Sequence, residues 1–283
     1  MESLSPIEIR DAVRTALAED VGPGDVTTLA TVPANSVASA RMVARERLVV
    51  AGLALAEACF RQLSANLQVE QLVRDGGLAK PGEPLLRLHG QAQALLTAER
   101  VALNFVQRLS GIATLTSKFV AAVDGTRARI LDTRKTTPGW RRFEKYAVAC
   151  GGGTNHRTGL YDLVLIKDNH LAALDGAQPN PIDAAVRRAR EKYPDLRVEV
   201  EADTLDQVRQ ALEVGANIIL LDNMSLEQLR AAVALVGGKA QTEASGGVTL
   251  ASVRAIAETG VDFISVGALT HSARAVDIAL DFE

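Results

Sequence analysis

The segment VEVEADTLDQVRQALEVGANIILLDNMSLEQLRAAVALVGGKAQTEASGG (198–247) decides the fold, because short apolar runs alternate in it with amphipathic stretches. The apolar runs at 198–200 and 218–221 predict strands, and the helical spacing of apolar residues predicts helices over 204–214 and 225–236. Both helices have an N-cap candidate and a glycine at the expected end, Thr204 with Gly215 and Ser225 with Gly237. A repeat of roughly 20 to 25 residues predicts parallel strands joined by crossover helices.

The same alternation continues on both sides of this segment. Further apolar runs predict strands at 130–131, 163–166 and 263–266, and the wide gap between the strands that start at 218 and 263 leaves room for one more strand around 240–243. Another helix is predicted over 249–259, with Thr249 as its N-cap and Gly260 at its end. No GxGxxG sequence follows a strand, which disfavours a dinucleotide-binding sheet and favours an αβ barrel.

The N-terminal third has a mixed pattern. Its elements are predicted as a helix begun by Ser5, Pro6 and Glu8, strands over 39–50 and 67–73, and a helix over 53–63. A long helical stretch then runs from Thr97, an N-cap candidate, towards Val123 and is notched at Gly111. Lys80 lies in a Gly/Pro turn, where a biotin or lipoyl carrier would place its lysine. A surface turn is favoured, because Lys80 precedes Pro81 and has no symmetrical apolar frame.

Composition excludes several classes of protein. The 283 residues include 31 Lys plus Arg against 34 Asp plus Glu, for a net charge of −3, and only 6 Phe, 3 Tyr and 1 Trp. This balance disfavours a nucleic-acid surface. No apolar run reaches the ~18 residues that a membrane helix needs, and the start MESLSPIEIRDAV lacks the basic and apolar regions of a signal peptide. Cys59 and Cys150 stand far apart without a CxxC motif, which is typical of buried thiols, so a cytoplasmic enzyme is expected.

Polar residues follow the carboxyl end of each predicted barrel strand, where active sites of such barrels are built. They include Asp132, Thr133, Arg134, Lys135, Lys167, Asp168, Asn169, His170, Glu201, Asp222, Asn223, Glu243, Ser245, Gly246, Gly247, Gly267 and Ala268. The cations among them, with His156 and Arg157, repel one another unless an anion joins them, and a guanidinium suits a carboxylate or phosphate. Glu201 and Asp222 suit ribose hydroxyls or Mg²⁺. The glycine-rich loops suit a phosphate. Together they predict a site for an anionic small acid and a phosphorylated sugar.

Sharper local motifs are missing from this rim. The run Cys150–Gly153 lacks the GK[ST] ending of a nucleoside-triphosphate loop, and no GxSxG sequence indicates a hydrolase. His156 and His170 lack the spacing of a zinc motif. Lys167 ends a strand as a Schiff-base lysine would, so an aldolase stays open at this point.

The motifs of the rim resemble those of the quinolinate phosphoribosyltransferases, the carboxylating nicotinate-nucleotide pyrophosphorylases. The matching blocks are LDTRKTTPG (131–139), KYAVACGGGTNHRTGLYDLVLIKDNH (145–170), VEVEADTLDQ (198–207), IILLDNM (218–224), EASGGV (243–248) and DFISVGALTHSARAVDIALDF (262–282), with GDVTT (24–28), AGLALAEACFRQL (51–63) and AERVALNFVQRLSGIAT (98–114) in the first half. Trp140 departs from the pattern, since a smaller apolar residue is expected after TPG. It puts no catalytic residue in doubt.

The resemblance implies an α/β fold in three parts. These are an open-faced α/β sandwich domain over 1–112, an incomplete, seven-stranded αβ barrel over 113–270, and a C-terminal helix over 271–283 that returns to the first domain. It also implies the reaction of quinolinate with phosphoribosyl pyrophosphate to give nicotinate mononucleotide, pyrophosphate and CO₂, with Mg²⁺, in NAD biosynthesis.

The family's site residues transfer to matching positions. Arg134, His156, Arg157 and Lys167 would hold the two quinolinate carboxylates, with Thr133 beside them, and Lys135 would face the pyrophosphate. Glu201 and Asp222 would bind the ribose hydroxyls and, through substrate and water, the metal. Phosphate would lie against Ser245, Gly246, Gly247, Val266, Gly267 and Ala268. The catalytic set would be Lys135, Lys167, Glu201 and Asp222. Arg100 would reach into the partner's site, which implies a homodimer with shared active sites.

Three rivals differ in what they need. A nicotinate-specific transferase needs a pocket for one carboxylate, which makes five clustered cations excessive. The aldolase needs a trappable imine. A non-catalytic relative of this fold, such as the molybdenum-transport-associated homologues, would have no need of Arg134, Lys135, Arg157, Lys167, Glu201 and Asp222, and all of these are present.

Overall fold

The computed structural model describes residues 3–283, and these form two compact units. The first unit contains the described residues up to Ser117 together with Thr137–Gly152 and Ser272–Glu283. The second contains Lys118–Thr136 and Gly153–His271. No helix among the described residues has the length and apolar character needed to span a membrane.

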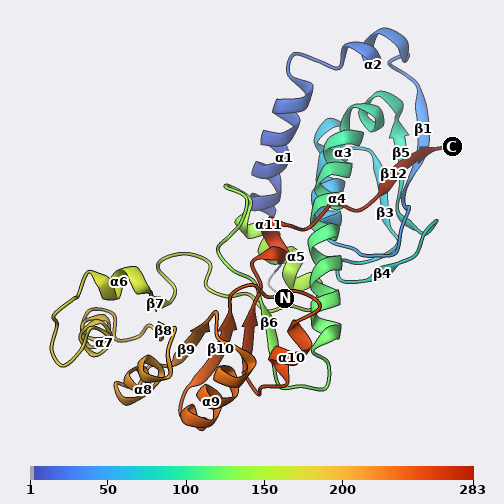
Figure 1. Cartoon of the computed structure of the whole chain (residues 1–283). Coiled ribbons are helices and arrows are strands. Elements are labelled where there is room, and N and C mark those ends of the chain that lie inside the picture. Colours follow the sequence, from blue (N-terminus) through green and yellow to red (C-terminus); the bar gives the residue numbers. More distant parts are fainter. Residues whose placement is uncertain (1–2) are drawn as a thin grey trace. The chain divides into compact units, whose positions relative to one another are not determined.

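The first unit is a mixed α/β structure (Figure 1). Its elements are α1 (Pro6–Val21), α2 (Val26–Thr31), β1 (Val37–Ala44), β2 (Leu48–Val49), α3 (Leu53–Leu63), β3 (Gln68–Gln71), β4 (Leu78–Ala79), β5 (Pro84–Gln91), most of α4 (Ala92–Ala122), α5 (Arg141–Cys150) and β12 (Ile278–Phe282). The predicted start of α1 is confirmed, since Ser5 and Glu8 form a capping box ahead of Pro6. Lys80 lies exposed in the turn between β4 and β5, as a surface turn requires.

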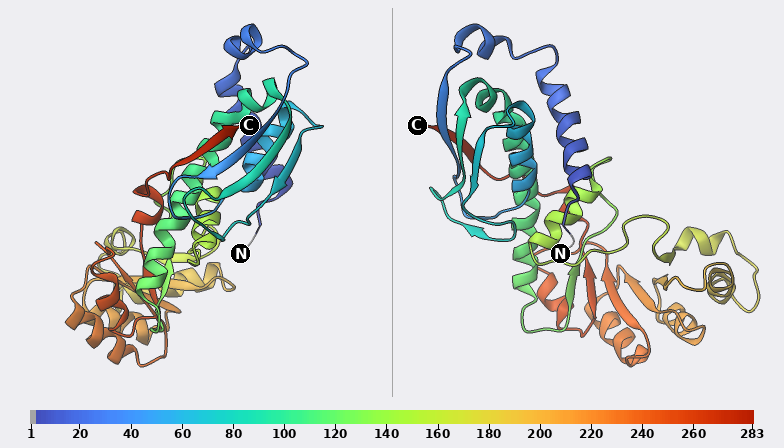
Figure 2. Two further views of the ribbon diagram at one scale, coloured as in Figure 1. Left: turned by 90° about the vertical axis from the view of Figure 1, so that its right-hand side faces the viewer. Right: turned by 180° about the vertical axis from the view of Figure 1, so that it is seen from behind.

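Four strands of this unit form an antiparallel sheet in the order β12-β1-β5-β3. Helices α3 and α4 lie against one face of it (Figure 2). Met42 and Leu86 pair across β1 and β5 and are fully buried, whereas their neighbours Arg41 and Arg87, also paired, are exposed. This alternation gives one apolar and one charged face, so the predicted open-faced sandwich is confirmed.

The C-terminal segment returns to this sheet, but the predicted helix over 271–283 is wrong. Residues 278–282 form β12, whose register with β1 runs from Ala40–Phe282 to Ala44–Ile278. An ion pair between Arg41 and Glu283 at 2.6 Å supports the pairing. The helix was expected only from the family resemblance, whereas the edge of β1 offers unpaired backbone groups that the segment satisfies by pairing as a strand.

The long helix also begins earlier than predicted. Helix α4 starts at Ala92, so Thr97 lies inside it rather than at its N-cap, and its hydroxyl donates to Asp25 Oδ2 at 3.0 Å. The notch at Gly111 has a packing cause. A Cβ there would overlap the carbonyl oxygen of Arg274, where the C-terminal segment crosses the helix. Trp140, outside the family pattern, stacks on Phe105 with ring centroids 5.3 Å apart.

The second unit carries the predicted alternation of strands and helices. Its elements are β6 (Arg129–Leu131), β7 (Val164–Ile166), α6 (Asp168–Ala172), α7 (Pro181–Lys192), β8 (Val198–Ala202), α8 (Leu205–Glu213), β9 (Ile218–Asp222), α9 (Leu226–Val236), β10 (Gln241–Ser245), α10 (Val253–Ala257), β11 (Phe263–Ser265) and α11 (Ala268–His271). Thr204 and Ser225 cap α8 and α9 as predicted. Thr249 does not cap α10, since its hydroxyl bonds within a turn that delays the helix until Val253.

The strands of this unit form one parallel sheet in the order β6-β11-β10-β9-β8-β7. The described residues therefore give six barrel strands rather than the seven expected. Where a further strand would lie, Thr154 makes a single bridge to Leu131. The next backbone N–H, that of His156, bonds to the Asp132 side chain instead of continuing a ladder. A side-chain acceptor thus ends the pairing after one residue.

Candidate active site

A cavity of about 770 Å³ opens at the carboxyl ends of the second unit's strands. Every substrate-binding residue predicted from the sequence lines it, except Arg100. Arg100 is exposed on α4 in the first unit. The lining residues are Asp132, Thr133, Arg134, Lys135, His156, Arg157, Leu165, Lys167, Glu201, Leu220, Asp222, Asn223, Glu243, Ser245, Gly246, Gly247, Val248, Thr249, Ser265, Val266, Gly267, Ala268 and His271.

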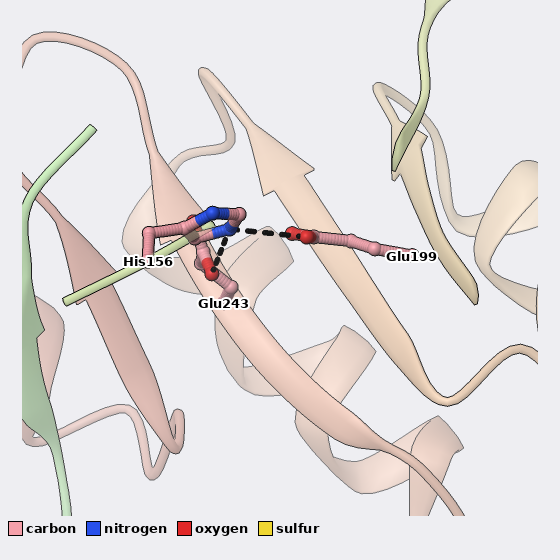
Figure 3. A group of neighbouring side chains, drawn as sticks. All are labelled: His156, Glu199 and Glu243. Atoms are coloured by element: carbon pink, nitrogen blue, oxygen red, sulfur yellow. Dashed lines mark ion pairs between the residues drawn. The ribbon is translucent and has the colours of Figure 1, made fainter. Parts of the chain in front are cut away.

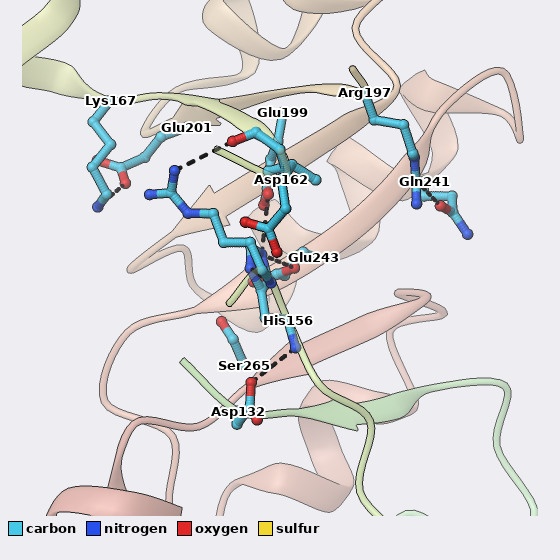
Figure 4. Close-up of polar contacts among 12 residues, drawn as sticks. Asp132, His156, Asp162, Lys167, Arg197, Glu199, Glu201, Gln241, Glu243 and Ser265 are labelled. Atoms are coloured by element: carbon cyan, nitrogen blue, oxygen red, sulfur yellow. Dashed lines mark hydrogen bonds and ion pairs between the residues drawn. The ribbon is translucent and has the colours of Figure 1, made fainter. Parts of the chain in front are cut away.

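Asp132, the first residue after β6, anchors one wall of the cavity. Its fully buried carboxylate accepts from the backbone N–H of His156 at 2.8 Å and from Asn155 Nδ2 at 2.6 Å (Figure 4). The two bonds hold the irregular stretch 154–157 against the end of β6. In a barrel, active-site residues normally follow directly after a strand. Here His156 and Arg157 lie instead on a loop that is hydrogen-bonded to the end of strand β6.

Three cations of the cavity have no ion pair with a carboxylate among the described residues: Arg134, Lys135 and Arg157. The Nε of Arg134 is buried and has no hydrogen-bond partner. Arg157 donates to the carbonyl oxygen of Leu163 at 3.4 Å, and burial, with the charge of Arg134, lowers its pKa. Half-buried guanidinium groups that repel each other attract an anion into the space between them.

The fourth predicted cation is already paired. Lys167 Nζ lies 2.7 Å from Glu201 Oε2, and the Glu201 side chain is only 10% exposed (Figure 4). The sequence interpretation placed Lys167 with the quinolinate carboxylates and Glu201 with the ribose. In the structure these two residues form an ion pair with each other, so the quinolinate and the ribose would both have to bind next to that pair.

At the wall of the cavity lies a group of three largely buried titratable side chains, which we call the buried triad: His156 and Glu243, which line the cavity, and Glu199 behind them (Figure 3). His156 Nε2 lies 3.0 Å from Glu199 Oε2 and 3.4 Å from Glu243 Oε2. The exposed fractions of the two glutamate side chains are 0% and 1%. His156 Nδ1 accepts from the backbone N–H of Arg157 at 2.7 Å.

The buried triad retains protons at neutral pH. Burial alone would lower the pKa of His156, but hydrogen bonding and charge from Glu199 and Glu243 outweigh it and raise that pKa to about 10. Burial also raises the pKa of Glu199, against the opposing effect of His156. Such protons belong to the group rather than to one member. Because Nδ1 accepts a hydrogen bond, we assign the ring proton to Nε2, which faces the two glutamates.

Backbone geometry shapes the opposite wall, where Asn223 and Gly246 touch. Asn223 adopts a φ of 53°, rare for a residue with a side chain, and its Nδ2 donates to Asp222 Oδ2 at 2.5 Å. A Cβ on Gly246, whose φ is 96°, would lie 2.6 Å from Asn223 Cγ. Gly267 is less constrained, since a Cβ there would meet only side-chain atoms, Lys135 Cδ and His271 Nε2, both at 3.1 Å. These glycines let a ligand approach the backbone closely.

Five residues received no role from the sequence and belong to the site or its support: Asp132, Glu199, Asn223, Glu243 and His271. Glu199 could have been found, because strand alternation puts it on the same barrel-facing side as Glu201. His271 lies on the one-turn helix α11, for which the sequence gives no periodic signal.

Fold and cavity together define a class: an αβ-barrel protein with a small antiparallel α/β domain and an anion-attracting site at its strand ends. Within that class, the family model described as the quinolinate phosphoribosyl transferase C-terminal domain matches residues 112–281, and the N-terminal domain model of the same family matches 25–110. The chain belongs to the quinolinate phosphoribosyltransferase family.

Named relatives agree with this assignment. The chain is 47% identical to the nicotinate-nucleotide pyrophosphorylase (carboxylating) of Mycobacterium leprae, covering 96% of both chains. It is 42% identical to a probable enzyme of that name from Bacillus subtilis, covering 98% of this chain and 94% of the relative. Among solved structures, the nicotinate-nucleotide pyrophosphorylase from Francisella tularensis superposes with a TM-score of 0.93 at 40% identity, covering 99% of this chain and 98% of the other.

Proposed function

We propose that this protein transfers the phosphoribosyl group of phosphoribosyl pyrophosphate to quinolinate, releasing pyrophosphate and CO₂ and forming nicotinate mononucleotide for NAD biosynthesis. The observation that carries the proposal is the set of cations without a carboxylate partner, Arg134, Lys135 and Arg157, which share one cavity with Glu201 and Asp222. A dicarboxylate supplies the charge that the arginines lack. A ribose and its phosphates suit the carboxylates and glycine loops opposite.

In this proposal each half of the cavity serves one substrate. Arg134 and Arg157 hold the quinolinate carboxylates, and the buried Nε of Arg134 gains the acceptor it lacks. Lys135, whose Cδ would touch a Cβ at position 267, lies beside the phosphate loop and faces the departing pyrophosphate. Glu201 and Asp222 bind the ribose hydroxyls.

The chemistry follows from where charge develops. The pyridine nitrogen forms a bond to C1 of the ribose as the C1–O bond to pyrophosphate breaks, and positive charge grows on the ribose. The carboxylates of Glu201 and Asp222 favour that charge electrostatically. The product nitrogen is then cationic, so it stabilises the electron pair left on C2 when CO₂ departs, and a proton replaces the lost carboxylate. The substrate is its own electron sink, so the step calls for no organic cofactor.

Glu201 and Asp222 also fit the predicted Mg²⁺. Both offer the carboxylate oxygens that this ion prefers, and both line the cavity. Because Lys167 already neutralises part of Glu201, we expect the ion to be held mainly by substrate phosphates and water. When bound, it would neutralise charge on the pyrophosphate.

Turnover is the direct test. Protein supplied with quinolinate labelled in the 2-carboxylate, phosphoribosyl pyrophosphate and Mg²⁺ should release ¹⁴CO₂ and nicotinate mononucleotide in equal amounts. Lys167→Ala and Arg157→Ala should each cripple quinolinate use while unfolding at wild-type temperature. Efficient turnover of nicotinate instead would support the sister transferase, and borohydride trapping at Lys167 would support the aldolase. Binding of both substrates without turnover would support a non-catalytic relative.

The proposal includes a cytoplasmic homodimer in which Arg100 enters the partner's cavity. It rests on the family resemblance and on the exposure of Arg100 on α4. Arg100→Ala and Lys167→Ala, each inactive alone, should regain activity when mixed, because exchanged dimers contain one intact site. Mass spectrometry would monitor the exchange. Proven exchange without recovery would refute a shared site.

A further inference from the structure

We propose that the buried triad acts as a positioning device: Glu199 and Glu243 fix the ring of His156, and the ring fixes Arg157 for anion binding. His156 would thus not bind a substrate carboxylate through a ring nitrogen, as the resemblance implies, but would act through its neighbour. The role of Arg157 in binding the anion rests on the proposed function. The contacts that orient Arg157 are observed in the structure and do not depend on that function.

Both ring nitrogens of His156 are engaged by the protein. Nδ1 accepts from the backbone N–H of Arg157 at 2.7 Å, and Nε2 faces the two glutamates at 3.0 and 3.4 Å. An imidazole has only these two polar atoms, so neither is left to meet a ligand. The ring can offer the cavity only its carbon edge or its face.

The two glutamates have no other visible task. Both oxygens of Glu199 and Oε2 of Glu243 are buried and make no hydrogen bond among the described residues, and the ion pairs of the two carboxylates are with the His156 ring. Unsatisfied buried carboxylates are costly, which implies that the site gains from what they orient. They come from β8 and β10, on either side of β9, and hold the ring between rigid strands.

The need for such a device comes from the loop itself. After Thr154 no strand pairing holds the chain, yet Arg157 must keep its guanidinium in the cavity. Asp132 secures the backbone N–H of His156, and the His156 ring secures that of Arg157. Two side-chain acceptors, Asp132 and His156, thus bind backbone N–H groups of a loop that has no strand partner.

A metal ion is the main alternative, since one histidine and two glutamates form a common ligand set. The hydrogen bond to Nδ1 argues against it. A metal-bound histidine normally donates its second N–H, whereas this Nδ1 accepts, so the proton of a neutral ring is on Nε2 and no lone pair is available there.

Replacing a glutamate by glutamine should change the affinity for quinolinate in opposite directions, depending on whether the glutamates act only as negative charge or position the ring. If the glutamates acted only as nearby negative charge, Glu199→Gln and Glu243→Gln would relieve repulsion and tighten quinolinate binding. If they position the ring, each should weaken it. We expect the Kd for quinolinate, measured by calorimetry without phosphoribosyl pyrophosphate, to rise about tenfold, the equivalent of one lost charge-assisted hydrogen bond. The kcat and the KM for phosphoribosyl pyrophosphate should change less than about threefold.

Glu213→Gln is the matched control, being the same substitution at an exposed position of the same unit, and it should leave the Kd unchanged. If Glu199→Gln fails to fold, Glu243→Gln decides, because its carboxylate lies farther from the ring. An unchanged or lowered Kd in the folded variants would overturn the proposal. So would Zn²⁺ retained by the wild type after dialysis and lost from either variant.

A substrate-independent readout separates this inference from the proposed function. Loss of ring orientation should free the Arg157 amide, so hydrogen–deuterium exchange over 155–158 should accelerate about tenfold or more in the glutamine variants but not in Glu213→Gln. Faster exchange with no quinolinate binding even by the wild type would refute the substrate assignment alone. Unchanged exchange would refute the positioning role, whatever the substrate.

Discussion

Replacing Gly246 by alanine should damage this protein far more than replacing its neighbour Gly247. Both glycines have positive φ values, 96° and 58°, so alanine at either costs about 1–2 kcal/mol of backbone strain. At Gly247 a new Cβ meets nothing within 4 Å. At Gly246 it would lie 2.6 Å from Cγ and 3.0 Å from the backbone nitrogen of Asn223.

The extra cost at Gly246 can be worked from the bonds of Asn223. To escape the new methyl group its side chain must give up the hydrogen bond to Asp222, worth about 1.5–3 kcal/mol because the acceptor is charged. Its N–H, bonded to the Ser245 carbonyl oxygen at 3.0 Å, must also shift. Gly246→Ala should therefore lose about 2.5–5 kcal/mol of unfolding free energy, against about 1–2 for Gly247→Ala.

Urea unfolding of the two single variants, and of Gly246→Ala combined with Asn223→Gly, would test this account. Asn223→Gly removes the obstructing side chain and tolerates the φ of 53°. The double variant should recover at least about 1.5 kcal/mol relative to additivity. Equal losses at both glycines, or additive effects in the double variant, would show that the Asn223 contact does not determine the loop. The same displacement should raise the KM for phosphoribosyl pyrophosphate, because Asp222 loses its orienting partner.

Two further predictions concern stability. Burial alone would raise the pKa of Asp262, but its bonds with Arg127 and Thr242 outweigh this effect and lower it below 3.8. Asp262→Asn should therefore cost about 1 kcal/mol at pH 7, reduced by the solvent exposure of Arg127, and urea titrations should show the difference shrinking as the pH falls through the folded pKa. A difference between the two proteins that stays constant as the pH is lowered through the acid range would contradict the linkage. Gly111→Ala should lower the melting temperature by many degrees, because its methyl group would overlap the Arg274 carbonyl oxygen, and an unchanged melting curve would show that the C-terminal segment can move aside.

Sequence periodicity predicted the barrel well where each unit is locally complete. The segments of β8, α8, β9 and α9 contain their own caps, stops and apolar faces, so little depends on distant residues. The prediction failed where the secondary structure of a segment depends on a partner that is distant in the sequence. β12 is a strand because β1 offers an edge more than 230 positions earlier, and the expected seventh barrel strand is reduced to one bridge because the Asp132 side chain takes its next N–H.

The site divides in the same way. Strand ends located the cations and carboxylates, since topology alone brings those positions to one rim. Pairing among them was not predictable. The rim was expected to hold five cations awaiting an anion, but Lys167 lies against Glu201 and His156 faces two glutamates buried below it. The sequence does not show how deeply each side chain is buried in the barrel. The depth of burial determines which charged groups lie close enough to form ion pairs.

That division of partners explains how the cavity can be stable when empty and still bind anions. The buried carboxylates are compensated internally, Asp132 by N–H donors and Glu199 and Glu243 by their ion pairs with His156. Among the described residues, the cations of the cavity that have no ion pair with a carboxylate are Arg134, Lys135 and Arg157, and water in the cavity screens them. Their mutual repulsion costs the free protein stability, and an anion that enters relieves it, so the relief adds to affinity. Any dianion gains that relief equally. Selectivity among dianions must therefore come from the geometry of the binding groups. The orientation of the Arg157 guanidinium, and the buried triad that sets it, should determine which dicarboxylate is accepted.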